Sequence, residues 1–185
     1  AGTMNVSGDS YTTINAVGSS AIDIDNIATG INVALEDDTN TAVALDYVTG
    51  ATANIQIGED SQTTGLTTFA VTDAATVNIS TQGGADTTIA SATTLDSADT
   101  ETLSITAGVA ASGINFSTAL AADDVETLTL TTSATDAHID FEATEVMTTA
   151  DALTTITVTA GGDDSSDILV AQIGDTAAAA ALTTL

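Results

Sequence analysis

Apolar residues recur in pairs separated by a single residue along almost the whole chain, and this period of two is the strongest constraint on the fold. Each pair places two side chains on one face of a strand, and the residue between them points to the other face. The pattern therefore predicts a series of short strands that share an apolar core. The pairs and triplets are Met4/Val6, Ile22/Ile24, Ile31/Val33/Leu35, Val43/Leu45, Ile55/Ile57, Phe69/Val71, Val77/Ile79, Leu103/Ile105, Ile114/Phe116, Leu128/Leu130, Ile139/Phe141, Ile156/Val158 and Ile168/Val170.

Clusters of Gly, Asn, Asp and Ser separate these pairs, for example DNIATG, TQGGAD and AGGDDSSD. Such residues accept tight turns and left-handed backbone. The chain has no proline and much Thr, and only its Ala-rich end favours a helix. Short strands that alternate with turns at this spacing are typical of a sandwich, a barrel or a solenoid.

A repeated unit in the second half favours the solenoid. ETLSIT at 101–106, ETLTLT at 126–131 and TTITVT at 154–159 are each followed by a second pair, in GINFST, HIDFEA and DILVAQ. We interpret LTTFAVTDAATVNIS at 66–80 as an earlier, tighter copy. A two-strand unit that cannot bury its apolar face alone is expected to stack on its neighbours.

We therefore expect an all-β fold, an irregular parallel β-solenoid that forms one elongated domain over residues 1–185. Residues 1–65 hold irregular strands, and residues 66–185 hold the repeat-like strands. A β-sandwich is the alternative, particularly for the first part. The start AGTMNVSGDS lacks an initiating Met and a basic signal region, so we expect the chain to be a segment of a longer protein.

The charge is entirely one-sided, with 26 Asp and Glu residues and no Lys or Arg. Two carboxylates 5 Å apart in water repel by roughly 0.8 kcal/mol, so cations from the medium must compensate the charge. Ca²⁺ is the expected cation because it binds carboxylate and carbonyl oxygens. Nucleic acid is excluded as a partner because its phosphates require Lys and Arg. Membrane insertion is not expected, since no apolar run approaches 18 residues.

The segments VETLTLTTSATDAHIDFEA, TETLSITAGVAASGINFS and LTTITVTAGGDDSSDILVAQIG resemble the Thr- and Ala-rich repeats of bacterial S-layer proteins and RTX-type secreted proteins. The resemblance covers roughly residues 66–185 as a style of repeat. It implies an exported, acidic protein of stacked β-strands with bound Ca²⁺, located outside the cell or at the cell surface.

Acidic turns supply the candidate Ca²⁺ ligands. The RTX nonapeptide is G-G-x-G-x-D-x-U-x, and GGDDSSDIL at 161–169 keeps its first two glycines, although its Asp167 falls one place late. GGADTTIAS at 83–91 keeps two glycines and one acid. Each turn can equally be a solvated surface without a metal. The candidate ligands are Asp163, Asp164, Asp167, Asp86, Asp37, Asp38, Asp23 and Asp25.

The sequence argues against an enzyme. His138 is the only histidine, and it lies between the inward residues of its unit, so we expect it on the outward face. A zinc site needs more His or Cys ligands, and no Trp is present to form a sugar platform.

The outward positions of the repeats are mostly Thr, which predicts ladders about 4.8 Å apart on stacked coils. These ladders resemble those of ice-binding β-solenoids, although the β-propensity of Thr explains them as well. The predicted ladder residues are Thr102/Ser104/Thr106, Thr127/Thr129/Thr131 and Thr155/Thr157/Thr159.

These features together predict an extracellular structural protein that assembles with copies of itself into a surface layer, sheath or filament, with Ca²⁺ bridging acidic turns. One alternative is a Ca²⁺-dependent adhesin or carbohydrate-binding module, whose partner would be a cell-surface polysaccharide. A second alternative is a pilus-like subunit that donates an N-terminal strand around Met4 and Val6.

Overall fold

The chain folds into a parallel β-solenoid, and the described part contains no helix. The computed structural model describes residues 3–8, 10–17, 21–36, 41–58, 64–84, 86–89, 93–94, 100–117, 120–121, 124–148 and 152–173. The strands are β1 (Met4–Asn5), β2 (Thr13–Val17), β3 (Ile22–Ile27), β4 (Asn32–Glu36), β5 (Thr41–Ile57), β6 (Thr64–Thr81), β7 (Thr87–Ile89), β8 (Thr93–Thr94), β9 (Thr102–Ala107), β10 (Gly113–Phe116), β11 (Leu120–Ala121), β12 (Thr127–Thr132), β13 (His138–Thr148), β14 (Thr155–Ala160) and β15 (Asp167–Ile173).

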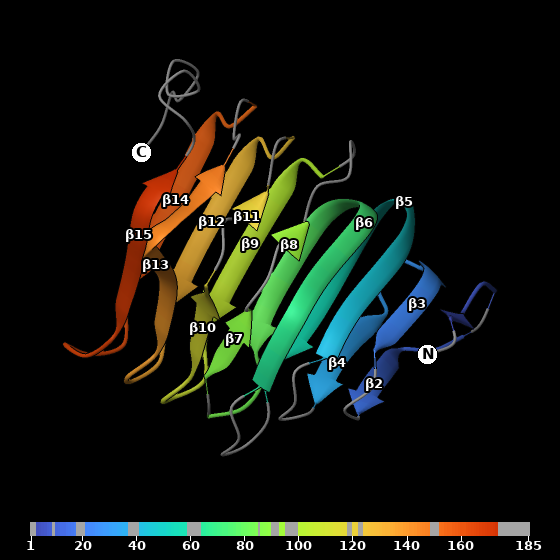
Figure 1. Ribbon diagram of the computed structural model, residues 1–185, viewed down its shortest axis with the longest axis horizontal. Helices are drawn as coiled ribbons and strands as arrows, with labels where there is room; N and C mark the ends of the chain where they lie inside the picture. The colour runs from blue at the N-terminus through green and yellow to red at the C-terminus, as the bar shows by residue number, and fades with distance from the viewer. Residues whose placement is uncertain are drawn as a thin grey trace.

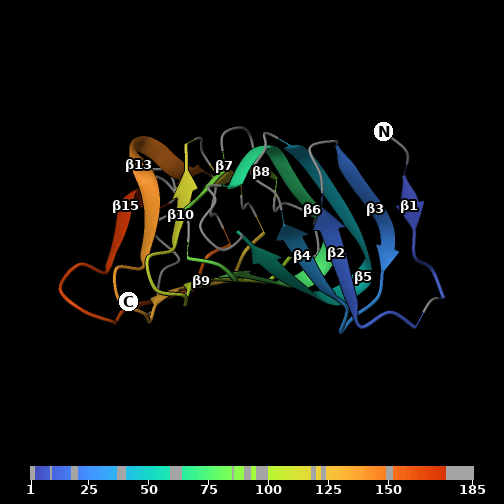
Figure 2. The same cartoon turned by 90° about the horizontal axis from the view of Figure 1, so that it is seen from below.

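Two parallel layers enclose the core (Figures 1 and 2). One layer contains β1, β3, the first parts of β5 and β6, and then β7, β10, β13 and β15. The short strands β8 and β11 extend this layer beside β6 and β13. The other layer contains β2, β4, the second parts of β5 and β6, and then β9, β12 and β14. Each pass through both layers is one coil.

The long strands β5 and β6 cross from one layer to the other, and left-handed backbone marks their bends. Gly50 has a φ of 78° and Asp73 a φ of 63°, and the register between the two strands shifts between Asp46 and Ala51. Gly and Asp are among the few residue types that adopt this backbone readily. The turn-forming residues thus act as corners inside continuous strands.

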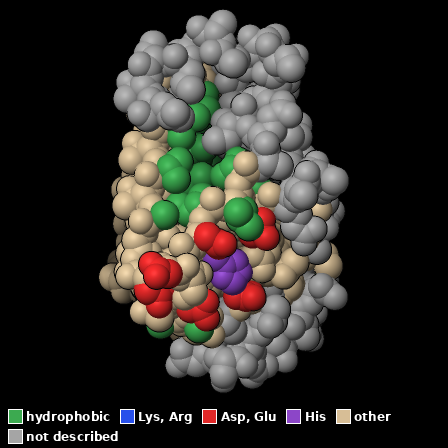
Figure 3. Space-filling view, turned by 90° about the vertical axis from the view of Figure 1, so that its left-hand side faces the viewer, with side chains coloured by type: hydrophobic (Ala, Val, Ile, Leu, Met, Phe, Trp, Pro, Cys, Tyr) green, Lys and Arg blue, Asp and Glu red, His purple; other side chains and the backbone are tan. Residues whose placement is uncertain are grey.

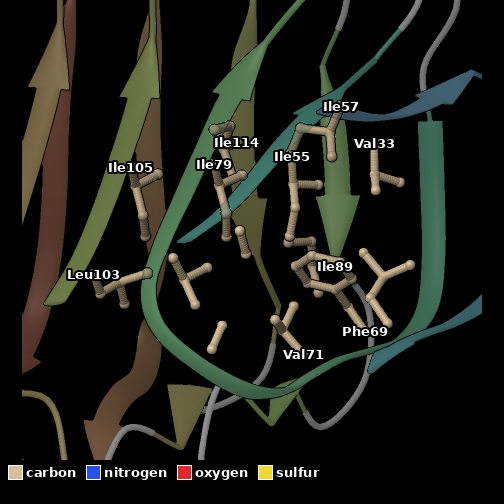
Figure 4. Packing of buried hydrophobic residues seen from close by; sticks show 14 of the residues in the cluster. Val33, Ile55, Ile57, Phe69, Val71, Ile79, Ile89, Leu103, Ile105 and Ile114 are labelled. Carbon is tan, nitrogen blue, oxygen red and sulfur yellow. The ribbon is translucent and has the colours of Figure 1, made fainter. Parts of the chain in front are cut away.

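The predicted repeat alignment is confirmed by the strand register. Leu103 pairs with Leu128, which pairs with Ile156, so ETLSIT, ETLTLT and TTITVT occupy the same position on successive coils. The second pairs also align, and the rings of Phe116 and Phe141 stack with centroids 4.6 Å apart. Most of the apolar pairs belong to one continuous buried cluster along the solenoid, part of which is seen in Figure 4.

The solenoid continues through the first part of the chain, so the sandwich alternative is wrong. Val33 pairs with Ile55, and Ile55 pairs with Ile79, in the same ladder that continues into the repeats. The segment 66–80 is a copy of the unit only in part. Its second half is the counterpart of ETLSIT, since Val77 pairs with Leu103, whereas its first half pairs with β7 and β8.

The expected burial of the apolar pairs fails near the two ends of the described stack. Met4 is 45% exposed and Val158 is 52% exposed, although both belong to predicted inward pairs, and Ile168 and Val170 are only partly buried. The described ladders give β1 and β14 one strand partner each, in β3 and β12. At these ends burial is incomplete along each pair, because Val6 and Ile156 are buried whereas their partners Met4 and Val158 are exposed.

This difference predicts unequal effects of truncation along one ladder. Leu130→Ala removes a side chain that is 0% exposed, and we expect it to lower the free energy of unfolding by about 2–5 kcal/mol. Val158→Ala, at the paired position in the next coil, should cost less than about 1 kcal/mol. Urea denaturation at fixed salt measures both values, and equal losses would contradict the end effect.

Candidate functional site

The outward positions of five neighbouring strands form an uncharged polar surface, which we call the neutral face. It lies on the flatter of the two layers, the one that contains β9 (Figure 2). None of its residues is charged, although the chain has 26 carboxylates. The neutral face consists of Thr52, Asn54 and Gln56 in β5, Thr76, Asn78 and Ser80 in β6, Thr102, Ser104 and Thr106 in β9, Thr127, Thr129 and Thr131 in β12, and Thr155, Thr157 and Thr159 in β14.

The strand register confirms the predicted Thr ladders and extends them. Ser104 pairs with Thr129, and Thr129 pairs with Thr157. Sequence reasoning missed the part of the face that lies on β5 and β6, where the Asn78 Nδ2 donates a hydrogen bond to the Asn54 Oδ1 at 3.0 Å. The signal was present, because TANIQ and TVNIS alternate polar and apolar residues as TLSIT does. Their alignment with the later repeats appears only in the folded chain.

Carboxylates border the neutral face where its strands begin. Glu101 and Glu126 are exposed immediately before β9 and β12. The Glu126 N–H donates to the Glu101 carbonyl oxygen at 2.9 Å, so the two residues lie on adjacent coils. At a strand separation of about 4.8 Å, two such charges repel by roughly 0.9 kcal/mol in water. Glu101 and Glu126 therefore form an acidic rim at one edge of an otherwise neutral surface.

His138 lies on the outward side of the other layer, as predicted, and connects two coils. It pairs with Gly113 on one side and with Asp167 on the other. Its ring occupies the space above Gly113, where an added Cβ would lie 2.1 Å from the His138 Nε2. The Nε2 is 3.6 Å from the Asp86 Oδ1. Acidic side chains surround the histidine on this end of the molecule (Figure 3).

The packing of His138 over Gly113 predicts a strong coupling between the two positions. Gly113→Ala should displace the ring and lower the free energy of unfolding, because the new Cβ would clash sterically with the imidazole. His138→Ala should remove most of this penalty in the double variant, since the ring is then absent. Urea denaturation of the unmodified chain, the two single variants and the double variant measures the coupling energy between the two positions. Additive effects would mean that the ring does not lie over Gly113.

The candidate Ca²⁺ ligands do not converge within the described residues. There, no three His, Cys, Asp or Glu side chains are placed to hold one ion. Asp23 accepts a hydrogen bond from the Thr3 hydroxyl at 2.5 Å, and Asp25 lies two residues further along the same strand, β3. Asp86 faces His138. Asp37 and Asp38 lie outside the described residues. Calcium binding stays a prediction for this chain.

The remaining candidates lie in the turn between β14 and β15 and at the first residue of β15. The Asp163 carboxylate accepts hydrogen bonds from the Ser165 hydroxyl at 2.7 Å and from the Asp136 N–H at 3.2 Å. These bonds, with smaller contributions from the Ser165 N–H and the Ser166 hydroxyl, lower the pKa of the Asp163 carboxyl below its ordinary value. Asp164 is exposed in the same turn, and Asp167 is exposed as the first residue of β15. The Asp163 carboxylate therefore joins this turn to the turn of the preceding coil.

The two glycines of GGDDSSD have a structural role in this turn. Gly162 has a φ of 115°, and a Cβ there would lie 2.3 Å from the Ala134 carbonyl oxygen. The Gly161 N–H donates to the Thr132 carbonyl oxygen at 2.9 Å. The resemblance of this segment to an RTX nonapeptide thus coincides with a close approach between two coils.

The hydrogen bonds of Asp163 predict a specific pH dependence. Because the folded-state pKa is lowered, the carboxylate stabilises the fold above its unfolded pKa, and this contribution is lost as the pH falls through the folded pKa. Asp163→Asn should therefore be less stable than Asp164→Asn at pH 7, and the difference should shrink in acid. The second variant is the matched control because it removes the same charge from the same turn. Thermal denaturation from pH 7 to pH 2.5 measures both, and a constant difference would contradict this role.

Comparison with protein-family models, curated proteins and solved structures finds no match for this chain. Across the described ranges, no helix has the length and hydropathy of a membrane-spanning segment.

Proposed function

We propose that this chain is part of an extracellular structural protein that assembles with copies of itself into a surface layer, sheath or filament in the presence of cations. The observation that carries the proposal is the separation of charge on a stacked β-scaffold. A chain with 26 carboxylates and no Lys or Arg keeps five adjacent strands free of charge on one face.

The scaffold supports this role because its contacts run from coil to coil. Parallel ladders and a continuous apolar cluster connect the described coils. A solenoid of this kind is quasi-one-dimensional, and it presents extended surfaces that repeat at the strand spacing. Regular surfaces of this type suit the repeated contacts of a lattice or fibre.

Assembly of such an acidic chain requires cations, because its negative charge is not compensated by basic side chains. Like charges on neighbouring molecules oppose assembly, and salt screens them only beyond about 8–10 Å at moderate ionic strength. Divalent cations lower this repulsion at the carboxylate rims, and Ca²⁺ is the expected ion because it accepts oxygen ligands in flexible geometry. We propose that these ions act between acidic surfaces, including those of different molecules.

The two alternatives receive less support from the described residues. A donated N-terminal strand would have to withdraw Val6, which is 2% exposed within its own chain. An adhesin or carbohydrate-binding module would need a sugar site, and the chain has no Trp to form a stacking platform. Binding of a glycan is therefore treated as an outcome of the experiment below.

The proposal predicts that Ca²⁺ drives assembly of the purified chain. At low ionic strength, we expect sheets or filaments by negative-stain electron microscopy after Ca²⁺ is added, and their dispersal with a lower melting temperature after excess EDTA. Mg²⁺ at the same concentration is the matched control for simple screening by a divalent charge. A chain that stays monomeric at every Ca²⁺ concentration would contradict the proposal. Ca²⁺-dependent glycan binding without assembly would instead support the adhesin.

A further inference from the structure

We infer that the neutral face packs against the neutral face of a second copy of this chain. The inference rests on the proposed function and names the surface that makes the lateral contact. The opposite layer carries outward or turn carboxylates along its length, including Asp23, Asp140 and Asp167. Two copies can therefore approach through the neutral face with the least electrostatic repulsion.

Hydrogen-bond chemistry favours the same pairing. Ionised carboxylates only accept hydrogen bonds, and the chain has no Lys or Arg to donate to them. Thr and Ser hydroxyls and Asn and Gln amides both donate and accept. Two identical neutral faces can thus satisfy each other, as the bond from Asn78 to Asn54 already shows within one copy. Two acidic faces lack the donors to do so.

The neutral face is small, so a single contact between two copies should be weak. Five strands at about 4.8 Å spacing and five residues per strand at about 3.3 Å cover roughly 400 Å² per copy. A pair would bury roughly 800 Å² in total, which is less than the roughly 1,000 Å² that a stable specific interface needs. Stable association therefore requires many such contacts in an array, where linked contacts gain avidity. The acidic rim at Glu101 and Glu126 makes the contact dependent on cations.

Cysteine cross-linking tests the contact directly because the chain has no native Cys. Ser104→Cys places a thiol on β9, the central strand of the neutral face, and is a small change. Thr88→Cys, on the outward side of β7 between Gly65 and Asn115 in the register, is the matched control on the other layer. Under assembling conditions, a short bifunctional maleimide should yield at least about five times more covalent dimer from Ser104→Cys, as expected of a self-complementary contact. Equal yields from both variants would overturn the inference.

A charge placed on the neutral face supplies a second, independent readout. Thr129→Asp should abolish assembly, whereas Thr88→Asp, which adds the same charge to the other layer, should leave it unchanged. Circular dichroism and urea midpoints establish that both variants fold. Thr129→Asp that folds and assembles like the unmodified chain would overturn the inference and leave the proposed function standing. Failure of the unmodified chain to assemble would instead count against the proposed function.

The ladder could alternatively bind ordered water. In that case the unmodified chain would produce thermal hysteresis in freezing solutions, Thr129→Asp would lose it, and Ser104→Cys would give no excess of cross-linked dimer. This combination of results would overturn the inference. Cross-linking of Ser104→Cys together with loss of assembly in Thr129→Asp would support it.

Discussion

The parallel register between successive coils is the interaction on which the rest of the structure depends. Each coil contributes only a few inward side chains per layer, too few to form a core alone, so burial comes from stacking. The ladder from Leu103 through Leu128 to Ile156 builds the core on one side. The same register sets Ser104, Thr129 and Thr157 side by side on the other. Core and surface are therefore two consequences of one alignment.

The absence of Lys and Arg restricts how such a chain can interact. With no basic side chain to neutralise them, the described carboxylates lie at turns, at strand ends and on the outward side of one layer. Within the described residues the single histidine supplies the only ion pair given by the structure, with Asp86. Five strands of the other layer remain uncharged on their outward side. The proposed contact between copies depends on this separation.

In the described part, the turns supply hydrogen bonds and close backbone contacts between successive coils. Asp163 uses its carboxylate to hold the turn of the preceding coil, and Gly162 allows the two backbones to approach. Both residues belong to the segment that most resembles a calcium repeat. A pattern that indicates an ion site can thus arise from the geometry of coil stacking, because tight parallel turns also require glycines and short acceptor side chains.

By itself, the sequence determined the strand pattern, the solenoid class, the alignment of the three late repeats and the outward position of the Thr residues and His138. These features follow from local alternation and from copies of similar length. Only the tertiary structure decided three other features. It exposes Met4 and Val158, and it extends the neutral face to β5 and β6. It also packs His138 over Gly113 and toward Asp86. The coils differ in length, as the separations of 24 residues between Asn54 and Asn78, 25 between Ser104 and Thr129 and 28 between Thr129 and Thr157 show. With unequal coils, only the folded chain determines which residues of neighbouring coils meet.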